Sequence, residues 1–177
     1  DAPRVNYLDL GTDGVSTQIA DQEEAPIIPP RAALPNGVTN YVTPNGLQEL
    51  KTELKQLAEE QANLVIKDDQ ERRRAIAVIT AKMNQLKERL ASARLLDPKD
   101  QPKDEVRFGA TVKLKNKTSN LVQEFQIVGV DEANIKKQKI AFVAPLVSAI
   151  IGAKVNENVS FNLGGEVREL EILSITY

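Results

Sequence analysis

The chain has 177 residues and a formal net charge of -2, with no cysteine and no histidine. This length fits one or two domains, and the lack of a basic surplus disfavours a dedicated duplex-DNA-binding protein. Without Cys and His, the chain cannot form disulfides, thiol or Ser-His-Asp catalytic sites, or zinc sites of the usual ligand types. A metal site would have to use carboxylates, which favour a hard ion such as Mg²⁺.

Residues 1–42 contain five of the nine prolines and six acidic residues, with no sustained periodicity. This composition predicts a flexible acidic arm, with Ile27-Ile28-Pro29-Pro30 as a local extended anchor. A tail without a function is the alternative. No apolar run reaches membrane-spanning length and no signal-peptide pattern opens the chain, so we expect a cytoplasmic protein with no membrane partner.

Residues 43–97 predict two helices folded back on each other. Thr43 can cap the first helix and Pro44 suits its first position, although Gly46 replaces the acid of a capping box. Apolar residues then recur at three-four spacing, a pattern typical of a coiled coil: Leu47, Leu50, Leu54, Leu57 and Leu64, and later Ile76, Ile79, Met83, Leu86, Leu90 and Ala93. A single long helix would expose this seam, so we favour a hairpin that reverses within about three residues of Asp69.

Residues 98–105 predict a linker that ends the second helix. Residues 106–177 contain short alternating stretches typical of strands, and residues 145–151 predict one short helix. Gly164-Gly165 predicts a turn and not a phosphate loop, because no helix follows it. The expected fold class is α+β: an antiparallel helical hairpin followed by a small antiparallel β domain with one short helix.

Several stretches follow one another in a recognisable order: residues 41–47, 90–97, 108–112, 126–133, 144–155 and 169–177. The first two resemble the opening and the end of the coiled coil of the bacterial transcript cleavage factors GreA and GreB, and the others resemble their C-terminal domain. The resemblance covers residues 41–177, and the acidic segment before it resembles an extended GreB-like variant.

The resemblance implies a C-terminal domain, residues 106–177, that is similar to the FK506-binding-protein fold and docks on core RNA polymerase at its secondary channel. It also implies a coiled coil that enters the channel, where two tip acids spaced Asp-x-x-Glu help hold the second Mg²⁺ of the polymerase. Asp68 and Glu71 have this spacing, with Asp69 between them. These three are the candidate tip acids, and Asp68 and Glu71 are candidate Mg²⁺ ligands only in complex with polymerase. No cofactor of the chain's own is implied, and RNA and DNA would be contacted only indirectly.

The tip also departs from the family pattern. Lys67 precedes Asp68, and residues 72–74, all Arg, follow Glu71, so cations could pair with the carboxylates. The first helix would measure about 33 Å to Asp68 at 1.5 Å per residue, several turns shorter than the resemblance implies. Acids at this position would also cap the second helix and complement its dipole.

The docking motif departs as well. An Asn/Asp-Ser-Pro sequence is expected before the short helix, but Val143-Ala144-Pro145 stands there, and Ser148 occupies a position often held by Arg. By resemblance, Val143, Ala144, Pro145 and Ser148 are the candidate polymerase-binding residues.

Three functions remain open. The favoured one is a monomeric transcription regulator that binds RNA polymerase at the secondary channel and modulates elongation or competes with cleavage factors. The second is an active cleavage stimulator that lends Asp68 and Glu71. The third, a peptide-binding or prolyl-isomerase module, rests on fold analogy alone. In the favoured case the chain is not an enzyme and at most stimulates the polymerase's own transcript cleavage.

Overall fold

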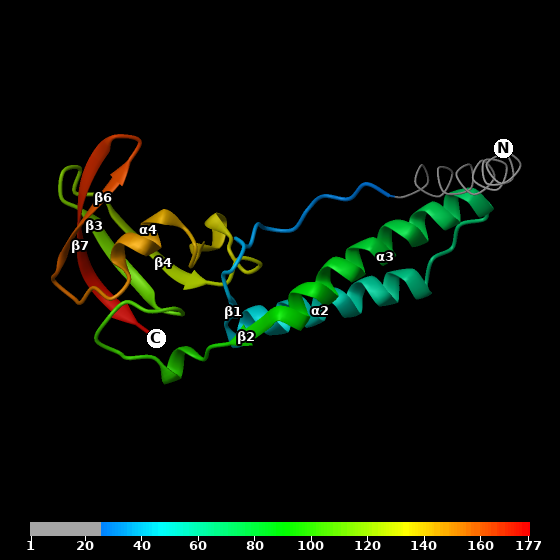
Figure 1. The fold of residues 1–177 in the computed structure, drawn as a ribbon, viewed down its shortest axis with the longest axis horizontal. Helices are drawn as coiled ribbons and strands as arrows, with labels where there is room; N and C mark the ends of the chain where they lie inside the picture. The colour runs from blue at the N-terminus through cyan, green and yellow to red at the C-terminus, as the bar shows by residue number, and fades with distance from the viewer. Residues whose placement is uncertain (1–25) are drawn as a thin grey trace, which may run out of the picture. The chain divides into compact units, whose positions relative to one another are not determined.

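The computed structural model describes residues 26–177 (Figure 1), so most of the predicted acidic arm lies outside the described residues. The chain divides into two compact units. One contains Gln56–Gln85 together with a segment that ends at Pro29, and the other contains Pro30–Lys55 and Leu86–Tyr177. The boundary between the units therefore crosses both long helices.

Two long helices form the predicted hairpin. Helix α2 spans Pro44–Ala62 and helix α3 spans Asp69–Ser92. Gln61 Nε2 donates to Thr80 Oγ1 at 2.8 Å, which joins the helices side by side (Figure 1). The chain reverses in residues 63–68, slightly before the predicted position around Asp69, and the single-helix alternative is wrong.

The apolar seam is buried most completely on α3. Leu86 is 0% exposed and Ile79 is 4% exposed, whereas Ile76, nearer the turn, is 36% exposed. The prediction that Ala93 continues the helical seam is wrong, because α3 ends at Ser92. Ladder bonds to a neighbouring strand replace the helical bonds there, which is a case of tertiary pairing overriding helical periodicity.

That pairing joins the two ends of the hairpin. Strand β1 spans Asn40–Val42 and strand β2 spans Ala93–Leu95, and they pair in parallel. Leu96 N–H continues the ladder to the Val42 carbonyl at 2.9 Å. Strand β1 lies inside the segment assigned to the arm, which shows that this end of the segment has a fixed partner.

The second sheet has five strands in the order β5-β4-β3-β7-β6. Their bounds are Thr111–Asn116 for β3, Val122–Val128 for β4, Lys139–Ala141 for β5, Asn158–Leu163 for β6 and Glu166–Thr176 for β7. Strands β4 and β5 pair in parallel and the other neighbours are antiparallel. The sheet is therefore mixed and not purely antiparallel as predicted. The connection from β4 to β5 contains the 3₁₀ helix Ile135–Lys137 and brings the chain back in the same direction, which a tight hairpin cannot do.

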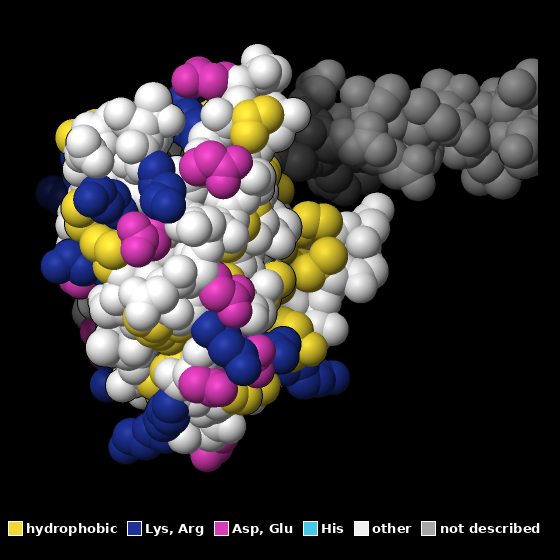
Figure 2. Space-filling view, turned by 90° about the vertical axis from the view of Figure 1, so that its left-hand side faces the viewer, with side chains coloured by type: hydrophobic (Ala, Val, Ile, Leu, Met, Phe, Trp, Pro, Cys, Tyr) yellow, Lys and Arg dark blue, Asp and Glu magenta, His cyan; other side chains and the backbone are white. Residues whose placement is uncertain are grey.

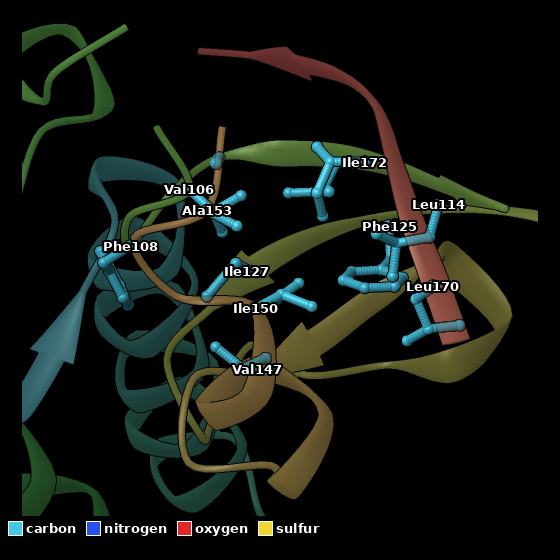
Figure 3. Packing of buried hydrophobic residues seen from close by; sticks show 12 residues of the cluster. Val106, Phe108, Leu114, Phe125, Ile127, Val147, Ile150, Ala153, Leu170 and Ile172 are labelled. Carbon is cyan, nitrogen blue, oxygen red and sulfur yellow. The ribbon is translucent and has the colours of Figure 1, made fainter. Parts of the chain in front are cut away.

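One face of this sheet packs against helix α4, which spans Pro145–Ile150 as predicted. Val147 and Ile150 of α4 belong to one buried cluster with the sheet residues Leu114, Phe125, Ile127 and Ile172 (Figure 3). Phe108, Ala110, Val112 and Leu114 are all buried, but Gly109 is buried as well and β3 begins only at Thr111, so the alternation holds only within the strand.

None of the helices in residues 26–177 is both long and apolar enough to cross a membrane. On the face drawn in Figure 2, basic and acidic side chains are interspersed among uncharged ones. This mixture agrees with the small net charge of the chain.

Leu86→Ala should lower the free energy of unfolding by about 2–5 kcal/mol, because it removes a fully buried side chain and leaves a cavity. Urea denaturation followed by circular dichroism would measure the loss. Ile76→Ala is the matched control on the same helix and should cost much less, because Ile76 is partly exposed. Equal losses for the two variants would contradict the burial of the seam at Leu86.

Candidate functional site

The hairpin turn holds the predicted tip acids, and Asp68 acts there as a helix cap. Its Oδ2 accepts the Glu71 N–H at 2.8 Å, and its carbonyl accepts the Arg72 N–H at 2.9 Å. A carboxylate at this position satisfies an unpaired N–H group and complements the helix dipole. The capping interpretation of Asp68 is therefore confirmed.

The neighbouring acid is paired with a cation. Asp69 accepts a hydrogen bond from Arg72 within the first turn of α3. Arg72 Nη1 also donates to the Ile66 carbonyl at 3.1 Å, so this guanidinium folds back over the turn. The predicted pairing of an arginine with the tip acids is present.

These contacts bear on the candidate Mg²⁺ ligands. One oxygen of Asp68 is used in the cap and Asp69 is engaged by Arg72, which leaves Glu71 as the remaining acid of the three. No group of three or more Asp, Glu, His or Cys in residues 26–177 is arranged to hold a metal ion. The donor set does not fit a metal site built by this chain alone, and two carboxylates would need further ligands from elsewhere.

The candidate docking residues surround the start of α4. Ala144 is the N-cap and provides no side-chain hydrogen bond, and Pro145 follows in the first turn. Pro145 and Ser148 are exposed, whereas Val143 and Ala144 are half-buried. The first turn of α4 therefore presents a small, uncharged surface.

An aromatic groove of about 320 Å³ lies beside this surface. Its lining residues are Tyr41, Leu96, Gln101, Arg107, Phe108, Phe142, Val147, Ser148 and Ile151. The rings of Tyr41, Phe108 and Phe142 lie 5.6 to 6.0 Å apart, centroid to centroid. Ser148 lies on this groove, while Val143, Ala144 and Pro145 do not line it. Tyr41, from β1, is a groove residue that the sequence did not reveal.

Two adjacent acids after β4 form a second site that the sequence analysis did not assign. The side chains of Asp131 and Glu132, here called the carboxylate pair, are 6% and 3% exposed. Glu132 Oε1 accepts the Thr43 hydroxyl at 2.5 Å, and Glu132 Oε2 accepts Asn45 Nδ2 at 2.9 Å and Lys139 Nζ at 3.2 Å. Thr43 Oγ1 in turn accepts the Gly46 N–H at 2.9 Å, so the predicted cap is confirmed.

Asp131 binds two arginines from different parts of the chain. Arg31 Nε donates to its Oδ1 at 2.9 Å, and Arg89 Nη1 donates to its Oδ2 at 3.0 Å. Burying a carboxylate is tolerated only when charged partners and hydrogen bonds compensate it. Asp131 and Glu132 both have such partners, so the carboxylate pair can be stable in this position.

Two glycines make room for this arrangement. A Cβ at Gly46 would lie 2.7 Å from Glu132 Oε1, and a Cβ at Gly129 would lie 2.5 Å from the Tyr41 carbonyl oxygen. Gly46 thus stands where a capping box has its acid because Glu132, distant in sequence, occupies that space. The available sequence signals were the glycine at this helix position and two acids directly after an apolar strand.

Burial and hydrogen bonding raise the pKa values of Arg31 and Tyr177, which both belong to the unit that contains Pro30–Lys55 and Leu86–Tyr177. The hydrogen bond from Arg31 to Glu53 is the main cause of the raised pKa of Arg31. Partial burial raises the pKa of Tyr177, whose hydroxyl donates to the Glu105 carbonyl at 2.6 Å and accepts the Arg107 N–H at 2.8 Å. Tyr177 thereby fixes the backbone beside the groove residue Arg107.

Comparison with known proteins gives one consistent family. Residues 101–177 match the family model described as transcription elongation factor, GreA/GreB, C-term. Transcription elongation factor GreA of Acidiphilium cryptum is 32% identical over 151 residues, which cover 77% of this chain and 96% of that protein. Transcription elongation factor GreB of Neisseria meningitidis serogroup B is 32% identical over 154 residues, covering 78% of this chain and 94% of that protein.

Solved structures with a similar chain include GreA factor homolog 1 (Gfh1) of Thermus thermophilus, with a TM-score of 0.37 and 22% identity over 79% of this chain and 100% of that chain. GreA/GreB from Nitrosomonas europaea has a TM-score of 0.38 and 20% identity over 79% of this chain and 99% of that chain.

The chain is of the α+β class, with a helical hairpin followed by a small mixed-sheet domain that carries one short helix. The extent and identity of the curated matches then define the family. The chain belongs to the GreA/GreB family of transcription elongation factors, which places it among transcription regulators.

Gly46→Ala should destabilise the protein by about 1–3 kcal/mol, because the added methyl group would collide with the buried Glu132 carboxylate. Chemical denaturation would measure the change, with Lys51→Ala on the exposed side of α2 as a control expected to stay within about 0.5 kcal/mol.

The cause can be tested with Glu132→Ala. If the collision is responsible, the double variant should lose less stability than the sum of the two single losses. A stabilised Gly46→Ala protein, as helix propensity alone would give, would contradict the close contact.

Proposed function

We propose that this chain regulates transcription by binding core RNA polymerase at its secondary channel, without supplying a catalytic metal ligand. It would modulate elongation or compete with transcript cleavage factors for the same site. Family membership over nearly the full length of the curated relatives is the observation that supports polymerase as the partner.

The proposed contact surface is the start of α4 together with the aromatic groove. Pro145 and Ser148 are exposed there, and the half-buried Val143 and Ala144 support the turn that presents them. Apolar and aromatic surface beside a few polar groups is typical of protein interfaces. The lack of charge on the first turn of α4 suggests contact by packing and backbone hydrogen bonding, and not by ion pairs.

The proposed absence of metal chemistry rests on the turn between α2 and α3. Asp68 caps α3, Asp69 is paired with Arg72, and Arg73 and Arg74 add positive charge beside them. Neighbouring cations and a competing hydrogen bond both reduce the availability of a carboxylate to an ion. We therefore propose that Mg²⁺ stays with the polymerase, and that this chain does not strengthen its binding.

Ser148→Glu should weaken binding to core RNA polymerase by about tenfold or more, equivalent to about 1.4 kcal/mol, because it places a charge in the proposed contact. Fluorescence anisotropy with the labelled full chain would measure affinity. Asn162→Glu, which adds the same charge on the exposed strand β6, is the matched control and should bind like the unaltered protein. If the unaltered chain does not associate with core enzyme at micromolar concentration, the proposed partner is wrong.

In a backtracked elongation complex with Mg²⁺, the chain should give little or no stimulation of transcript cleavage, and excess chain should inhibit a GreA factor used as positive control. Asp68→Asn is an informative variant because asparagine also caps helices, so the fold is preserved while the carboxylate is removed. Strong cleavage that disappears in Asp68→Asn or Glu71→Gln would show that the chain is an active cleavage stimulator. No inhibition of the control factor at large excess would rule out competition for one site.

A further inference from the structure

The side chain of Arg31 joins three parts of the unit that contains Pro30–Lys55. Its Nη1 and Nη2 donate to the two carboxylate oxygens of Glu53, on α2, at 2.8 and 3.2 Å. Its Nε donates to Asp131 Oδ1, in the loop after β4, at 2.9 Å. A planar guanidinium with five donors can make a bidentate pair and a second ion pair at once, which an ammonium group cannot do in this geometry.

A second arginine fixes the same stretch from α3. Arg89 donates to the free oxygen of Asp131 at 3.0 Å and also to the Ala32 carbonyl. The backbone next to Arg31 and the carboxylate that binds Arg31 therefore share one partner. The side chains of Arg31 and Arg89 are mostly buried, so these contacts are only partly screened by solvent.

The charges in this cluster balance. Two arginines face two carboxylates, Asp131 and Glu53, and each oxygen of Asp131 has its own donor. Loss of Arg31 would leave the pair of Asp131 with Arg89 in place, so the loop after β4 would keep a partner. The contacts that would be lost are those that Arg31 makes with Glu53 on α2 and with Asp131 in the loop after β4.

We propose that residues 30–34 form a strap, a segment that holds the base of the helical hairpin on the sheet domain. Arg31 is the residue that fastens it, through its contacts with Glu53 and Asp131, and these contacts are here called the clasp. Arg31 is a positioning residue: it ties α2 to the loop after β4, whose Glu132 also binds the cap residue Thr43 of α2. This role goes beyond polymerase binding, since the clasp acts within this chain. Residues 1–42 were predicted to be a flexible arm from their composition. Residues 30–34, near the C-terminal end of that segment, instead hold fixed contacts with the folded chain.

Hydrogen–deuterium exchange of the full chain tests the strap without polymerase. Arg31→Gln should increase exchange of the Val38 amide, which donates to the Pro35 carbonyl at 3.2 Å, and of the amides in β1 by about tenfold or more, because two charge-assisted contacts are lost, while exchange in β3 and β7 stays unchanged. Arg31→Lys should give an intermediate increase, because it keeps the charge but not the fork. Arg94→Gln is the matched control: Arg94 is exposed, its recorded hydrogen bond is to the adjacent Ala93 carbonyl, and the variant should behave like the unaltered chain.

Glu53→Gln gives a second, independent test from the other side of the contact. It should raise exchange in the same residues. The double variant with Arg31→Gln should exchange no faster than Arg31→Gln alone, since the contact between Arg31 and Glu53 is already lost in Arg31→Gln. Cleavage by trypsin after Arg31 should also be faster in Glu53→Gln than in the unaltered chain. Unchanged exchange in Arg31→Gln would overturn the strap. An equal increase across β3 and β7 would do so as well, since it would mean general destabilisation.

Discussion

The side chain of Glu132 takes the place that an acid in the first turn of α2 would otherwise occupy. It receives the Thr43 hydroxyl and two further donors, and it lies so close to Gly46 that no side chain fits between them. A helix start normally depends on residues next to it in sequence. Here it depends on the loop after β4, so the start of the hairpin and the sheet domain are stabilised by the same buried carboxylate.

The carboxylate next to it extends the same constraint to α3. Asp131 binds Arg89 near the end of α3 and Arg31 before β1, while β1 and β2 pair directly. Two adjacent acids thus hold the entry and the exit of the hairpin. Each oxygen of Asp131 has its own arginine, so the buried carboxylate keeps one charged partner when the other is removed. The same loop is part of the stretch that resembles the GreA and GreB factors, and in this chain both of its carboxylates are paired internally.

The acids at the turn of the hairpin are used in a different way. One carboxylate oxygen of Asp68 caps the first turn of α3, and Asp69 forms an ion pair with Arg72. Contacts within the helix start therefore explain the presence of two of the three tip acids. Asp68 and Asp69 therefore have a physical explanation that needs no metal, whereas Glu71 takes part only through its N–H group. The surface proposed above for polymerase binding lies elsewhere, at the start of α4, where exposed residues lie beside an aromatic groove.

Periodicity was sufficient for the local elements, because burying a repeated apolar face leaves few alternatives. The two helices of the hairpin followed from that pattern, whereas α4 followed from the residue types at its two ends. The Thr43 cap followed from its residue type, and the tip acids could be interpreted as helix caps from their position. These features depend on contacts between residues close in sequence, whose geometry composition and spacing describe well.

The pairing of strands and of charges far apart in the chain could not be predicted from the sequence, because the same residues were compatible with several partners. The parallel pairing of β4 with β5, the conversion of Ala93 from helix to strand, and the strand at Asn40–Val42 each depend on a backbone partner far along the chain. The same is true of the carboxylate pair and of Arg31, since an acid or an arginine in isolation is most simply explained as exposed. The sequence by itself determined the two long helices and the short helix α4, whereas only the tertiary structure decided which strands pair and which charges are buried together, since both depend on where the folded chain brings their partners.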